Sequence, residues 1–131
     1  PVDVDSSPLA FRWEDSLAQL DAAPQDAAGL ASKVIELGST AMPTVSIHVH
    51  RLEEGFTSTV HQTTANSIFT VVEGSGVLEI DGESITFERG DVIAVPSWRP
   101  YTFTAHTRAH LVRCSDEAVL SALGLLRTEA L

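Results

Sequence analysis

The sequence has little positive charge and almost no cysteine. Its 131 residues hold 8 Lys and Arg against 18 Asp and Glu, a net charge of −10 with His neutral. Nucleic acids and anionic membrane surfaces bind clustered Lys and Arg, so this balance argues against both as partners. The one cysteine, Cys114, excludes a disulfide framework and predicts a cytoplasmic protein. Because it lies in an apolar run, we interpret its thiol as a small core side chain.

Long hydrophobic runs are also missing, as is a starting methionine. No stretch has the length and apolarity of a transmembrane helix, and no charged-then-apolar leader opens the chain. The first residue is Pro1, which predicts a trimmed start or a piece of something longer. The length and the hydrophobic fraction of 44% suffice for one globular domain with its own core.

From Val45 onwards, short apolar runs alternate with turn residues, which is typical of antiparallel strands. Asp81-Gly82, between two alternating runs, is a two-residue hairpin signal. We therefore predict an all-β domain, a sandwich or barrel. The expected strands are Val45–Leu52, Phe56–Gln62, Ser67–Val72, Val77–Ile80, Ser84–Phe87, Val92–Val95, Tyr101–Ala105 and Ala109–Cys114.

A helix is predicted near each end. The first runs from Phe11 to Asp21 and is followed by a possible strand, Val34–Leu37. Ser115 or Asp116 is placed to cap the second helix. Its expected apolar face consists of Val119, Leu120, Leu123 and Leu126. The chain thus divides into a linker with a short helix (1–44), a barrel (45–114) and a C-terminal helix (115–131).

Two stretches resemble the two motifs of the cupin family in degenerate form. The run GDVIAVPSWRPY, from Gly90, has the glycine and proline of the second motif but ends on Tyr101, where that motif has a histidine. Upstream, five residues separate Gly55 from His61, but Thr63 stands where a second histidine belongs. Gly74 or Gly76 then closes the motif. This resemblance implies a cupin barrel, a double-stranded β-helix or jelly roll.

Longer runs narrow the resemblance. NSIFTVVEGSG (66–76), GDVIAVPSW (90–98) and LVRCSDEAVLSALGLLR (111–127) resemble the C-terminal half of gentisate 1,2-dioxygenase and of its relatives acting on salicylate and 1-hydroxy-2-naphthoate. SPLAFRWEDSLAQL (7–20) is similar to the linker between the two cupins of these enzymes. The resemblance implies a bicupin parent in which Fe(II), held by three histidines, activates O2 to open an aromatic ring.

Carried over position by position, the three ligands fall on His61, Thr63 and Tyr101. The resemblance therefore implies a half that has lost most of its metal ligands, holds no cofactor of its own and serves folding and assembly. Its expected partner is the N-terminal cupin half or another copy of itself, in a homo-oligomer. We expect the chain alone not to cleave gentisate or salicylate.

His48 and His50 lie two apart on an expected strand, so their side chains share one face. If that face is the interior, they and His61 form a three-imidazole cluster. The chain is then a stand-alone small cupin that binds a metal or a small molecule. If Ile47 and Val49 face inward instead, the two histidines lie at the surface or at a subunit contact. A sugar- or regulator-binding cupin would use the same fold.

Arg51 and Arg113 are candidates for binding a substrate carboxylate through two hydrogen bonds, with surface ion pairs as the default interpretation. His110 follows a turn and is expected in solvent. Tyr101 and Phe103 are interpreted as aromatics that fill the barrel; the alternative is a lid on a small apolar pocket.

Overall fold

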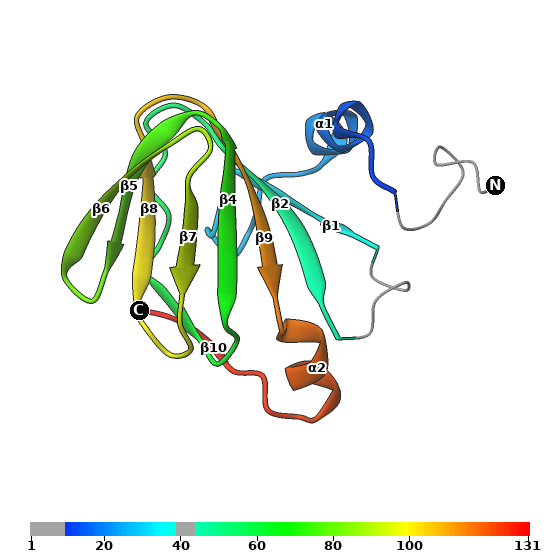
Figure 1. Cartoon of the computed structure of the whole chain (residues 1–131), viewed down its shortest axis with the longest axis vertical. Helices are drawn as coiled ribbons and strands as arrows, with labels where there is room; N and C mark the ends of the chain where they lie inside the picture. Colours follow the sequence, from blue (N-terminus) through cyan, green and yellow to red (C-terminus); the bar gives the residue numbers. More distant parts are fainter. Residues whose placement is uncertain (1–9, 39–43) are drawn as a thin grey trace.

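The computed structural model, which describes residues 10–38 and 44–131, is a sandwich of two five-stranded antiparallel sheets (Figure 1). Sheet A has the strand order β1-β2-β9-β4-β7, and sheet B has the order β10-β3-β8-β5-β6. The strands are β1 (Lys33–Leu37), β2 (Ser46–Leu52), β3 (His61–Thr63), β4 (Ser67–Glu73), β5 (Ser75–Ile80), β6 (Glu83–Glu88), β7 (Val92–Val95), β8 (Tyr101–Ala105), β9 (Ala109–Ser115) and β10 (Thr128–Ala130). The predicted all-β fold is confirmed.

The strand predicted over Phe56–Gln62 is wrong for most of its length. Only its end, as β3, belongs to a continuous strand; before it, the chain pairs with β8 irregularly, through an isolated bridge from Thr57 to Thr104 and a few backbone hydrogen bonds around it. A hydroxyl group interrupts the regular ladder here: Ser58 Oγ accepts a hydrogen bond from the Phe103 N–H at 2.9 Å, while the Ser58 N–H donates to the Phe103 carbonyl oxygen at 2.8 Å. The edge strand β10, short and polar, gave no apolar alternation from which to predict it.

Helix α1 (Trp13–Ala22) covers part of the outer face of sheet A (Figure 1). Leu20, which is fully buried, packs against Leu37 and Val49 from β1 and β2. This contact explains the predicted helix, because its buried residues recur on one side. It also means that both faces of β2 are covered, one by α1 and one by sheet B.

A chain of polar contacts holds α1 in place. Arg51 donates from Nη1 to Asp21 Oδ1 at 2.6 Å and from Nε to His110 Nε2 at 3.0 Å. The other imidazole nitrogen, Nδ1, pairs with the Glu73 carboxylate, and the Trp13 ring lies edge-on over the imidazole. The expectations of a solvent-exposed His110 and a surface Arg51 are therefore wrong, because the helix covers both.

Helix α2 (Glu117–Ala122) is shorter than predicted and has no buried residue. It ends before Gly124, whose φ of +71° turns the chain towards β10, so Leu123 stays 66% exposed. Ser115 Oγ accepts a hydrogen bond from the Glu117 N–H at 3.4 Å, whereas the Asp116 carboxylate binds Asn66 instead. Neither helix in the described part of the chain is long and apolar enough to cross a lipid bilayer.

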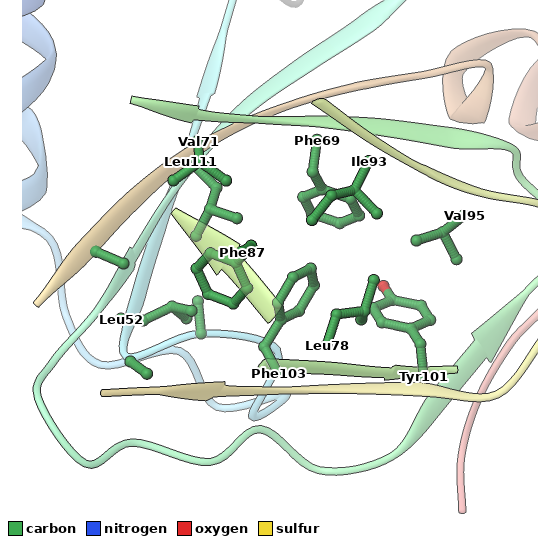
Figure 2. Packing of buried hydrophobic residues seen from close by; sticks show 13 residues of the cluster. Leu52, Phe69, Val71, Leu78, Phe87, Ile93, Val95, Tyr101, Phe103 and Leu111 are labelled. Atoms are coloured by element: carbon green, nitrogen blue, oxygen red, sulfur yellow. The ribbon is translucent and has the colours of Figure 1, made fainter. Parts of the chain in front are cut away.

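The main core lies between the two sheets (Figure 2). Phe69 and Ile93 come from sheet A and meet Phe103 and Tyr101 of sheet B, with Phe69 and Phe103 ring centroids 4.9 Å apart. Tyr101 and Phe103 are 4% and 3% exposed. Their predicted role as core-filling aromatics is confirmed.

Candidate functional site

Buried polar side chains gather on the inner face of sheet A, towards the end where α2 follows β9. Arg113 of β9 lies between His48 of β2 and Phe69 of β4 in the strand register. Its diagonal neighbours on the same face are His50 and Ser67. We call His48, His50, Ser67 and Arg113 the interior polar cluster.

The orientation of β2 follows from these contacts. The His50 ring packs edge-on against Phe69 with centroids 5.7 Å apart, so His50 and its same-face neighbour His48 point inward. The alternative in which Ile47 and Val49 face inward is wrong, because they belong to the cluster of apolar residues beneath α1. His48 and His50 therefore lie neither on the outer face of sheet A nor at a subunit contact formed by that face.

The interior polar cluster contains unpaired polar atoms. His48 Nδ1, His50 Nε2, Ser67 Oγ and Arg113 Nε are buried and have no hydrogen-bond partner within the described residues. His50 and Ser67 are each 3% exposed, and Arg113 is 6% exposed. The guanidinium meets one carboxylate at the rim, with Arg113 Nη1 3.7 Å from Glu117 Oε2. Most buried polar groups in folded proteins are hydrogen-bonded, so four such atoms at neighbouring positions on one sheet face set this cluster apart as the candidate site.

Burial sets the charge of this cluster. It lowers the pKa of His48 to about 4 and that of His50 well below 6.5, with the positive charge of Arg113 acting in the same direction. Burial raises the pKa of the Tyr101 phenol, against the opposing effect of Arg113. At neutral pH both imidazoles and the phenol are therefore uncharged, and the guanidinium supplies the positive charge.

His61 lies on sheet B, directly opposite Tyr101 in the register. Its Nδ1 donates to the carbonyl oxygen of Thr59 at 2.9 Å, which leaves the lone pair on Nε2. Thr63 Oγ1 is already engaged, accepting from the Ala65 N–H at 3.3 Å and the Thr128 hydroxyl at 3.1 Å. Within residues 10–38 and 44–131, no three His, Cys, Asp or Glu side chains group closely enough to hold a metal ion. The structure thus does not bring His48, His50 and His61 together as such a group.

Sequence reasoning named Arg113 as a carboxylate-binding candidate but took surface pairing as its default, which is wrong because the side chain points between the sheets. It missed Ser67, although alternation with Phe69 and Val71 along β4 puts all three on one face. Cys114 is exposed, so its interpretation as a core side chain is also wrong. It neighbours the inward Arg113 on β9 and therefore points outward.

Comparison with known proteins agrees with this architecture. The sequence model of the family described as "Cupin domain" matches residues 48–114. The chain is 34% identical to a 1-hydroxy-2-naphthoate 1,2-dioxygenase of Nocardioides sp. (strain KP7), over 93% of this chain and 34% of that protein. It is 32% identical to a gentisate 1,2-dioxygenase of Streptomyces sp., over 96% of this chain and 39% of the relative.

The crystal structure of salicylate 1,2-dioxygenase from Pseudoaminobacter salicylatoxidans, described as an adduct with gentisate, superposes with a TM-score of 0.83. The two are 30% identical, over 92% of this chain and 36% of that one. This chain therefore spans between about a third and two-fifths of the length of these relatives. The predicted resemblance to the gentisate-type dioxygenases is confirmed, and the chain belongs to the cupin family.

Proposed function

We propose that this chain is the C-terminal type of cupin half from a cytoplasmic ring-cleaving dioxygenase, and that it serves folding and assembly rather than oxygen chemistry. The observation that supports this most is the set of side chains at the family's three ligand positions. His61 is the one imidazole among them, beside Thr63 and Tyr101. Catalytic metal sites generally need three protein ligands and an open coordination position.

These residues do not fit Fe(II). A threonine hydroxyl is a weak ligand at neutral pH, and that of Thr63 already makes two hydrogen bonds. The Tyr101 phenol keeps its proton, and its ring packs against Phe69 and Phe103. The Arg113 guanidinium inside the barrel repels a cation. We therefore assign no step of oxygen activation to this domain.

The activity test is oxygen uptake by the purified chain, supplied with Fe(II) and either gentisate or salicylate. We expect no uptake above that of iron in buffer, because no three-histidine set forms. Full-length salicylate 1,2-dioxygenase from P. salicylatoxidans provides the positive control under the same conditions. Iron-dependent uptake that scales with the concentration of this chain would contradict the proposal.

The assembly role is supported by an uncovered apolar surface. Beyond α1, the outer face of sheet A presents Ile68 of β4 beside Ala94 of β7 and Cys114 of β9. Ile68 is 51% exposed, and Val92 of β7 is 66% exposed. Within residues 10–38 and 44–131, sheet B and α1 cover other parts of sheet A and leave this outer region exposed. We propose that a second copy of the chain, or the other cupin half in a longer parent, packs there.

Mass measurement by light scattering tests this surface. We expect the wild-type chain to be a dimer at high concentration and Ile68→Lys to be a monomer, because a buried unpaired charge opposes association. The matched control is Ile85→Lys, since Ile85 is 39% exposed on β6 of the other sheet. A wild-type monomer at all concentrations would exclude a second copy of the chain as the partner, and equal disruption by both substitutions would exclude this surface as the dimer interface.

A further inference from the structure

We propose that the interior polar cluster is a binding site for a small monocarboxylate. Its four open atoms belong to side chains on three adjacent strands, β2, β9 and β4, and all lie on the same face of sheet A. Arg113 is central, since His48 is its direct neighbour across the sheet and His50 and Ser67 are its diagonal neighbours. The assignment does not depend on the proposed role in assembly.

The donors suit a carboxylate in number and in kind. Arg113 Nε always donates, and the Ser67 hydroxyl can turn to donate as well. A neutral imidazole has one N–H, and where the open nitrogen carries it the ring donates to one carboxylate oxygen without adding charge. Leaving buried polar atoms unpaired costs free energy. A ligand that forms hydrogen bonds to several of them at once therefore gains binding free energy from each.

The charge of the site selects an anion with one negative charge. One guanidinium faces two neutral imidazoles. Two carboxylates lie at the rim: Glu117 Oε2 is 3.7 Å from Arg113 Nη1, and Glu36 Oε2 is 3.8 Å from His48 Nε2, on side chains that are 34% and 47% exposed. A metal cation would meet the positive charge of Arg113, and within the described residues no three His, Cys, Asp or Glu side chains group closely enough to bind it. A dianion such as sulfate would bring two charges to a single buried cation. A monocarboxylate balances the guanidinium and matches its planar fork.

The walls beside the cluster are apolar. The Phe69 ring contacts His50 and lies 6.2 Å, centroid to centroid, from the Tyr101 ring. A ligand with a carboxylate at one end and a short hydrocarbon chain at the other would place its carboxylate against the interior polar cluster and its hydrocarbon chain against the aromatic rings. We therefore choose acetate as the simplest probe, because its size demands least of the packed interior.

The test follows the arginine Nε–Hε resonances of the ¹⁵N-labelled chain while sodium acetate replaces sodium chloride at constant ionic strength. We expect the Arg113 resonance to move and to saturate, with a dissociation constant roughly in the 0.1–10 mM range expected for so few ligand atoms. Arg51 is the internal control. It is equally buried, at 4% exposed, but its Nε is already bonded to His110, so its resonance should stay still.

Two mild variants make the result specific. Ser67→Ala removes one donor and should weaken acetate binding several-fold. Glu117→Gln removes the carboxylate that competes for Arg113 and should tighten binding by a similar factor. If the Arg113 resonance does not saturate, if Arg51 moves equally, or if neither variant changes the affinity, the cluster holds water and the proposal is wrong. Oxygen uptake plays no part in this readout, so its outcome is separate from that of the proposed function.

Discussion

Replacing Gly76 with Ala should lower the free energy of unfolding by about 3 kcal/mol. Gly76 lies in β5 between Phe87 of β6 and Ala105 of β8. A Cβ placed there would lie 2.7 Å from Phe87 Cζ and would press still harder on the backbone carbonyl oxygen of Thr104. The backbone of a central strand cannot yield without losing its ladder, so the clash is not relieved by a change of rotamer. Urea unfolding followed by circular dichroism measures the loss.

Gly55→Ala separates this steric effect from the conformational preference of glycine. Gly55 has φ of +79°, and an added Cβ would meet nothing within 4 Å. Gly55→Ala should therefore lower the free energy of unfolding only through the left-handed backbone conformation, by about 1 kcal/mol. Gly76 does not have a positive φ, so the loss in Gly76→Ala comes from the steric collision. Equal losses for the two variants would show that the sheet around Gly76 adapts. A close approach requires glycine at both candidates for the end of the first cupin motif, since a Cβ on Gly74 would collide with the backbone of Arg108 and Ala109.

The all-β architecture was predictable because most strands show apolar alternation between clear turns. Asp81-Gly82 is an example, since Asp81 and Gly82 have φ of 49° and 81° and join β5 to β6 as the hairpin signal predicts. Alternation failed where a hydroxyl side chain replaced a backbone acceptor and interrupted the regular pairing, as Ser58 Oγ does for the Phe103 N–H. It also failed at β10, because its three residues are all exposed. This strand is held in sheet B by its pairing with β3.

The candidate site was harder to predict than the fold. His48, His50 and Arg113 were all named from the sequence, but β2 alternates polar and apolar side chains that are buried on both faces. Nothing local indicates which face α1 covers, so the inward direction of the histidines required the tertiary contact of Leu20 with Val49. The clustering of Arg113 with Ser67 depends on the pairing of β9 with β4, more than forty positions apart in the sequence, and no spacing rule shows it.

Mild acid should destabilise the folded chain well before its carboxylates are protonated. In the folded state the pKa of His48 is about 4 instead of 6.5, and that of His50 is well below 6.5. Below pH 6.5 the two histidines therefore bind protons in the unfolded chain but not in the folded chain. The stabilisation is complete above about pH 7 and falls as the pH drops towards 4. For His48, whose side chain is 14% exposed, the total is roughly 3 kcal/mol.

Urea unfolding between pH 5 and 7.5 isolates this effect, because the ordinary pKa values of Asp and Glu lie below that window. The double variant His48→Gln/His50→Gln keeps a polar side chain at each position but has no proton to bind, so its stability should change much less across the window. His106→Gln is the matched control, because His106 is exposed in the turn before β9. Since the slope for each buried histidine approaches 1.4 kcal/mol per pH unit, parallel profiles for the wild type and the double variant would mean that the two imidazoles take up protons without unfolding. The barrel interior would then be open to water, and the neutral state assigned to His48 and His50 would be wrong.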